Sequence, residues 1–222
     1  MSANTSAPAD AQTRQAPPRR ITFGAFSGAL VTALLFAAWA PDPATDTSPG
    51  GLREYLEASG GALQVYSLLL AVAATAIVLF SAHLRGVLRR VSDGAGYGAD
   101  FVFGGGMLCS AWLLIAAGFT GTIAFGDVAA LDDTLLVSYW GLGAVGDMVG
   151  VAAFVIKGAV MVAASLVILR TRALAAWAGW LGLAFGVLTW AALAIDPLFY
   201  VGIFAFALWP LAISIAVLLR RR

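Results

Sequence analysis

The stretch GALQVYSLLLAVAATAIVLFSAHL (Gly61–Leu84) contains no Asp, Glu, Lys or Arg. A helix crosses the hydrocarbon core of a bilayer, about 30 Å thick, with about 20 mostly apolar residues. This stretch is therefore long and apolar enough to be a transmembrane helix. Five other stretches meet the same criterion, and the six predicted spans are Ile21–Ala40, Gly61–Leu84, Phe101–Phe125, Gly150–Leu169, Ala175–Ile195 and Phe199–Leu219. The expected fold is an all-α, polytopic transmembrane six-helix bundle.

The composition of the whole chain also indicates a protein that is embedded in a lipid bilayer. Of the 222 residues 61% are hydrophobic and 11% are charged, whereas soluble domains carry about 25% charged residues. A chain this apolar cannot cover itself with polar surface. The net charge of +1 gives no support to nucleic-acid binding, which needs a basic surface. The excess of arginine over lysine, with abundant Ala and Gly, is typical of GC-rich bacterial genomes.

The positions of the arginines predict the orientation, because Lys and Arg accumulate on the cytoplasmic side of a membrane. If six helices alternate in direction, eleven of the twelve arginines fall on one side and only Arg53 falls on the other. That other side collects eight acidic residues, namely Asp42, Asp46, Glu54, Glu57, Asp127, Asp132, Asp133 and Asp196. We therefore expect a protein of the cytoplasmic (inner) cell membrane with both termini in the cytoplasm.

The first 18 residues are rich in Ala, Pro, Ser and Gln and are predicted to be a disordered cytoplasmic tail. Residues 19–222 then form a single transmembrane domain. An alternative is that the first span is a cleaved signal peptide, since AWA (Ala38–Ala40) matches an A-x-A site. The apolar stretch is longer than the usual 7–15 residues of such a signal and Pro41 follows the site, so an uncleaved anchor is preferred.

Two segments on the outer side have helical patterns. In SPGGLREYLEASGG (Ser48–Gly61), Leu52, Tyr55 and Leu56 fall at i, i+3 and i+4, which predicts a short amphipathic helix on the outer leaflet. The segment DDTLLVSYWGLGAVGD (132–147) begins with carboxylates that can cap a helix and then becomes apolar. It is predicted to be an interfacial helix that runs into the fourth span.

Lys157, in FVIKGAVMVAA (Phe154–Ala164), is the only lysine and lies within the fourth predicted span. A charge at that depth costs about 3 kcal/mol on insertion scales, so another interaction must offset it. Its neighbours on the same helix face are small residues, namely Gly146, Gly150, Ala153 and Ala164. Because small residues mark the faces on which membrane helices pack, Lys157 is predicted to point into the bundle.

Lys157 has a structural and a functional interpretation. In the structural one, which we prefer, its side chain reaches toward the outer headgroups or pairs within the bundle. In the functional one it is a buried counter-ion or a contact for a solute. In both, its amine is expected to meet a backbone carbonyl, a hydroxyl group or an outer vestibule filled with water. The candidate intramembrane polar site consists of Lys157, Asp147, Thr120, Asp196, Tyr66 and Tyr200.

The remaining polar residues do not suggest catalysis. One histidine, His83, is too few for the two axial ligands of a membrane b-type haem or for a usual zinc site. Cys109 is interpreted as a small core residue. The sequence shows no Ser/His/Asp set and no paired intramembrane carboxylates. We therefore assign no catalytic, cofactor-binding or metal-binding residues, and we expect a protein that is not an enzyme and needs no cofactor.

Pairs of small residues four positions apart recur in the predicted spans. Such pairs let helix backbones approach closely, within one chain or between membrane proteins. They occur at Gly24/Gly28, Gly106/Ser110, Gly146/Gly150 and Gly182/Gly186. Pro210 in the last span has no backbone N–H and predicts a kink there.

Two segments resemble a known group of proteins. They are HLRGVLRRVSDGAGYGADFVFGGGMLCSAWLLIAAG (His83–Gly118) and Leu174–Arg222, which holds a W-x-G-W-x-G pattern and a last span that contains Trp and ends in arginines. Both are similar to uncharacterised bacterial six-helix integral membrane proteins, classed as a domain of unknown function. The resemblance implies the fold and the membrane location, and it implies no activity.

Two functional hypotheses follow from these observations. The preferred one is a non-catalytic binding, regulatory or assembly subunit, because packing motifs are plentiful and catalytic sets are lacking. The alternative is a small-solute or ion transporter or permeation protein that uses Lys157 near the membrane midplane. A lipid-modifying enzyme is the least favoured class, because no acid–base pair lies at either membrane interface.

Overall fold

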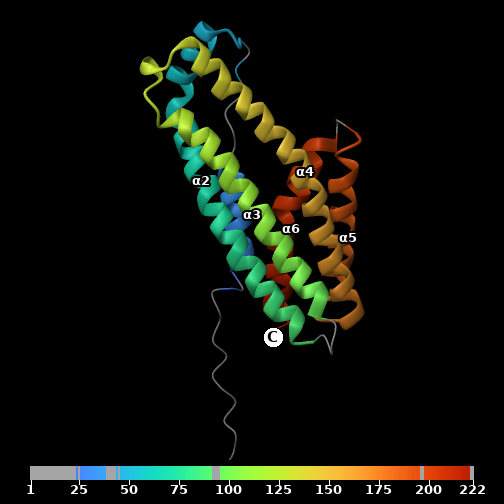
Figure 1. Ribbon diagram of the computed structural model, residues 1–222. Helices are drawn as coiled ribbons and strands as arrows, with labels where there is room; N and C mark the ends of the chain where they lie inside the picture. The colour runs from blue at the N-terminus through green and yellow to red at the C-terminus, as the bar shows by residue number, and fades with distance from the viewer. Residues whose placement is uncertain are drawn as a thin grey trace, which may run out of the picture.

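A computed structural model describes residues 24, 26–38, 44, 46–91, 96–195 and 198–220, without the side chains of residues 129, 139 and 142–151. The predicted tail, residues 1–18, lies outside this description. The elements, drawn in Figure 1, are α1 (Ser27–Ala37), α2 (Pro49–Arg89), α3 (Gly96–Ala124), the short 3-10 helix η2 (Val128–Ala130), α4 (Asp133–Thr171), α5 (Ala176–Ala191) and α6 (Phe199–Leu219). The prediction of an all-α protein is confirmed.

Four of these helices are long and apolar enough to cross a membrane, namely α2, α3, α6 and the part of α4 from Ala152 to Thr171. They support a membrane location. Helices α1 and α5 are also apolar, but their 11 and 16 residues are fewer than the roughly 20 that a span needs. Residues 21–23, 25 and 39–40, which flank α1 in the predicted first span, are not described.

The helices are arranged as a closed ring. Each long helix packs against the next one in the chain, and α1 also packs against α6. In Figure 1, α2 and α3 lie side by side, while α4 leans across from their far end to pair with α5. Side chains from helices that are not neighbours in the ring can also meet across its interior. Phe80 of α2 and Trp209 of α6 do so, with ring centroids 5.7 Å apart.

Small residues bring the helices of the ring together, as their spacing predicted. A Cβ atom on Gly28 would overlap the backbone oxygen of Pro210, and one on Gly106 would overlap the side chain of Ser81. Ser110, one turn after Gly106, donates its hydroxyl to the carbonyl of Ala74 at 2.9 Å. These contacts join α1 to α6 and α2 to α3.

Glycines also allow close contacts of α5 with α4 and α6. A Cβ atom on Gly186 would lie 3.0 Å from the carbonyl oxygen of Gly158, so α5 and α4 are in backbone contact there. Gly182, one turn earlier, faces the side chains of Ser165 and Trp209. The predicted pair Gly146/Gly150 lies outside the described side chains.

Helix α2 begins well before the predicted second span. Its N-cap is Ser48, whose hydroxyl accepts a hydrogen bond from the amide of Gly51 at 3.2 Å, and Pro49 occupies the first turn. The amide of Ser48 in turn donates to Asp46, which keeps the pKa of the Asp46 carboxyl below its usual value. With 41 residues, α2 is about 60 Å long and exceeds the hydrocarbon thickness of a bilayer.

The separate amphipathic segment expected on the outer leaflet is therefore a wrong prediction. Residues 48–61 continue into the second span without a break. Leu52 and Leu56 are buried, and they pack with Leu136 of α4 in a small second core rather than on lipid. The reason is that α4 also extends beyond its predicted span, so the apolar side of the segment meets protein.

Helix α4 confirms the expected cap at its start. The Asp132 side chain accepts a hydrogen bond from the amide of Leu135 at 2.7 Å, which satisfies one of the free N–H groups of the first turn. From there α4 runs unbroken to Thr171. The segment 132–147 is thus the N-terminal part of the same helix that carries Lys157.

Candidate site at Lys157 inside the helix ring

Lys157 lies in the middle of the ring and is only 6% exposed. The prediction that it points into the bundle is confirmed. The small-residue face of α4 allows this, since neighbouring helices approach closely along it.

Three aromatic rings surround the amine of Lys157. Its Nζ atom lies 4.4 Å from the ring centroid of Trp112, 4.7 Å from that of Phe154 and 4.9 Å from that of Phe206. All three distances are within the 6 Å at which a cation is attracted to the negative face of an aromatic ring. Phe154 precedes Lys157 by one turn on α4, whereas Trp112 comes from α3 and Phe206 from α6. We call the three rings of Trp112, Phe154 and Phe206 the aromatic cage.

The cage takes the place of the oxygen partners that the sequence predicted. Among the described residues, the structure gives Lys157 no hydrogen bond and no ion pair, so the expected carbonyl or hydroxyl contact is not found there, and the contact with an outer vestibule stays a prediction. The physical reason is that π faces also carry negative potential, and they offset part of the cost of burying an ammonium group.

Of the other predicted members of the site, those that the structure describes make no hydrogen bond or ring contact with Lys157. Thr120 lies two turns along α3 from Trp112, about 12 Å away. Tyr200 is 63% exposed and has an edge contact with Phe199. Tyr66 packs on the main core from α2. The Asp147 side chain and Asp196 lie outside the described residues.

Several buried donors near the centre of the ring lack an acceptor. The Nε1 atom of Trp112, a member of the cage, is buried and has no hydrogen-bond partner in the described structure. The same is true of Trp209 Nε1 and Ser165 Oγ, which both face Gly182. A buried donor without an acceptor is costly, so these atoms mark places where a ligand or water would be stabilised.

Cys109 is buried in α3, one turn before Trp112, and belongs to the main core. Its interpretation as a core residue is confirmed.

Metal-binding and acid–base groups are sparse in the part of the molecule that the structure describes. No three His, Cys, Asp or Glu side chains there form a group that could hold a metal ion. What the cage itself can do chemically is to hold a positive charge and present N–H donors.

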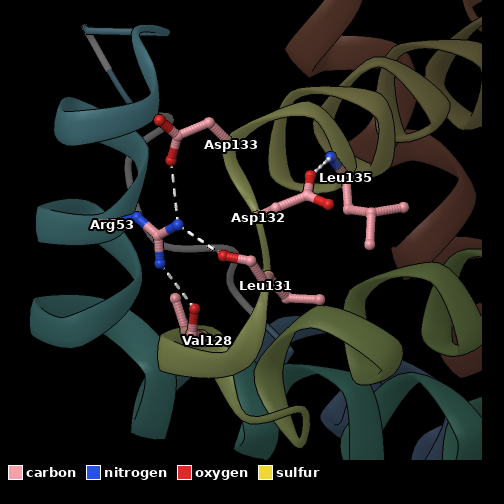
Figure 2. Close-up of polar contacts among 6 residues, drawn as sticks. All are labelled: Arg53, Val128, Leu131, Asp132, Asp133 and Leu135. Atoms are coloured by element: carbon pink, nitrogen blue, oxygen red, sulfur yellow. Dashed lines mark hydrogen bonds and ion pairs between the residues drawn. The ribbon is translucent and has the colours of Figure 1, made fainter.

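Arg53, the arginine that departs from the predicted charge pattern, has a structural role that Figure 2 shows. Its guanidinium donates to the carbonyls of Val128 at 2.8 Å and Leu131 at 2.5 Å, and it pairs with Asp133 at 3.0 Å. These contacts fasten the start of α2 to the connection between α3 and α4. An arginine is used because its planar fork can reach several oxygens at once.

At the opposite end of α2, Asp100 of α3 receives two arginines. Arg85 Nε lies 2.7 Å from Asp100 Oδ1, and Arg89 Nη2 lies 2.6 Å from Asp100 Oδ2. The guanidinium of Arg220 donates to the carbonyl of Ala173, which joins the ends of α6 and α4. The arginine-rich ends of the helices therefore lie together at one end of the ring (Figure 1).

Comparison of this chain with protein-family models, with curated proteins and with solved structures found no match. The resemblance to bacterial six-helix membrane proteins therefore stays a prediction.

Proposed function

We propose that this chain is an integral protein of the bacterial cytoplasmic membrane and acts there as a non-catalytic binding, regulatory or assembly subunit. In this proposal all six helices α1 to α6 cross the membrane and both termini are cytoplasmic. The four long apolar helices support the membrane location. The short helices α1 and α5 support six spans, because each packs between two of the other helices of the ring.

The observation that carries the subunit proposal is the aromatic cage. The one lysine of the interior is enclosed by rings from α3, α4 and α6. Such a charge links three helices, and among the described residues it forms no hydrogen bond or ion pair with a group that would transfer a proton. This arrangement favours a scaffold over a reaction centre.

The outer face of α5 offers a surface for assembly. Trp180 is 66% exposed and Trp177, one turn earlier, is 42% exposed. Tryptophan is enriched where membrane proteins meet headgroups and where proteins meet each other. A partner helix that packs on α5 would cover both rings.

Purification from native membranes in a mild detergent tests the subunit proposal. A second membrane protein should be retained in a fixed ratio, and Trp180→Ala should weaken its retention. Tyr97→Ala is the matched control, because Tyr97 is 89% exposed but belongs to α3. A single species without a partner, or equal retention by both variants, would count against the proposal.

A second candidate function is the permeation of a small solute or ion. Trp112 has a buried N–H donor without an acceptor among the described residues, and the ammonium group of Lys157 lies 4.4 Å from the centroid of its ring. Flux measured in proteoliposomes tests this candidate. The parent should conduct and Lys157→Met should not, and equal flux through both would exclude a role of Lys157.

A further inference from the structure

We propose that the interior of the helix ring binds a small monovalent anion at Lys157 and the Nε1 atom of Trp112. The proposal names a ligand class for the Lys157 site on which the second candidate function rests. It requires neither transport nor a protein partner, so it can stand or fall independently of both.

The first argument is charge balance. Among the described residues, Lys157 is the one lysine or arginine that lies away from the ends of the helices. The acidic residues whose side chains are described all lie at or beyond helix ends or in the outer parts of α2 and α4, namely Asp46, Glu54, Glu57, Asp100, Asp127, Asp132 and Asp133. The described interior thus carries a positive charge without a carboxylate. A buried charge of this kind is stabilised by a counter-ion.

The second argument concerns hydrogen bonding. The cage surrounds the ammonium group of Lys157 with three ring faces, but the N–H of Trp112 has no acceptor in the described structure. The three rings attract the ammonium through their faces. The N–H of Trp112, in contrast, lies in the plane of its ring and needs an acceptor at the ring edge. That donor is buried and has none in the described structure. An anion at the edge of Trp112 would accept from this N–H and stay close to Nζ of Lys157.

The charge and the size of the ligand follow from the same surroundings. Among the described side chains the interior has one uncompensated positive charge, so a monovalent anion leaves it neutral, while a divalent anion would reverse its sign. Lys157 is 6% exposed and enclosed by three rings, so a small anion would require the least rearrangement of these side chains. Water would satisfy the indole N–H but would leave the charge uncompensated. Chloride, bromide and formate are therefore the suitable probes.

The experiment measures thermal unfolding of the purified protein in detergent. Sodium chloride, sodium bromide and sodium formate are compared with sodium gluconate at equal ionic strength. A ligand that binds the native state raises the melting temperature by mass action, and a large anion such as gluconate should not enter the ring. We expect at least one small anion to raise the melting temperature by several degrees in a saturable manner.

Three variants assign that shift to the site. Lys157→Met removes the charge and keeps the length of the side chain, so the shift should disappear. Trp112→Phe keeps a ring in the cage but removes the N–H, so the anion concentration for half the shift should rise several-fold. Trp209→Phe is the matched control, because it removes another buried indole N–H without a partner, outside the cage. That variant should respond like the parent.

The outcomes separate the proposals. A shift that persists in Lys157→Met, or the absence of any anion-specific shift in the parent, overturns the anion site and leaves the subunit proposal untouched. Should Lys157→Met fail to fold, the comparison of Trp112→Phe with Trp209→Phe decides, and equal responses overturn the site. A confirmed shift without anion flux in proteoliposomes supports a bound ion and excludes anion permeation.

Discussion

The amine of Lys157 lies 4.4 Å from the ring centroid of Trp112, although the two residues belong to different helices. Phe206 of α6 completes the contact from a third helix. One ammonium group therefore connects α3, α4 and α6 through the interior of the ring. This connection replaces the oxygen partners that a charged group in a membrane usually finds.

Replacing Lys157 by methionine should leave the protein as stable as the parent or make it more stable. Burying the charge costs about 3 kcal/mol, and cation–π contacts return about 2 kcal/mol or more when they are desolvated. Methionine avoids the cost and still fills the cage. Lys157→Ala should instead lower stability by about 2–5 kcal/mol, because it leaves a cavity. The test is thermal unfolding in gluconate, without a small anion. A melting temperature of Lys157→Met well below that of the parent would contradict this balance between burial cost and cation–π contacts.

Gly106→Ala should destabilise the contact between α2 and α3 by about 1–3 kcal/mol. The added methyl group would overlap both Oγ and Cβ of Ser81, so the two helices would have to separate. Gly104→Ala on the same helix is the control, since nothing lies within 4 Å of its Cβ position. That change should be neutral or stabilising by up to about 1 kcal/mol. Equal melting temperatures of the two variants would contradict the packing described here.

Thr32→Val should lower stability by about 1 kcal/mol. The Thr32 hydroxyl is buried and donates to the carbonyl of Ala207 at 2.6 Å, across the contact between α1 and α6. Pro210 lies in the next turn of α6 and cannot donate a helical hydrogen bond, so added donors are valuable there. Thr75→Val removes only an exposed bond within α2 and should have almost no effect. A larger loss in Thr75→Val would argue against this role of Thr32.

Arg53→Lys should loosen the end of the molecule where α2 begins, without unfolding the ring. A lysine has no planar fork, so it cannot contact Val128, Leu131 and Asp133 together as Arg53 does. Hydrogen exchange of the amides in residues 128–136 should become faster, while exchange in α3 stays unchanged. Arg90→Lys, at the exposed end of α2, is the control. Unchanged exchange in residues 128–136 would show that the fork is not needed.

Single cysteines should define the orientation. A cysteine in place of Asp133 should react with an impermeant reagent from outside the cell, and one in place of Asp93 only from inside. The native Cys109 is 2% exposed and should stay unlabelled in the folded protein. Labelling of position 93 from outside, or of position 133 only from inside, would reject the proposed topology.

The sequence by itself determined where the helices lie and which way Lys157 points. Apolar length is a property of consecutive residues, and α6 occupies the same residues, Phe199–Leu219, that were predicted. Small residues at helical spacing mark a packing face in the same local way, so the inward direction of Lys157 followed from the chain alone.

Only the tertiary structure decided what the lysine meets. Trp112 and Phe206 reach Nζ because α3, α4 and α6 border one interior. The order of the helices around the ring and the rotation of each helix depend on packing between helices, so the sequence of one helix does not determine them. For the same reason, the segment 48–61 packs against α4 instead of lying on lipid. Local patterns set each helix and its buried face, whereas contacts between distant residues depend on how all the helices pack together.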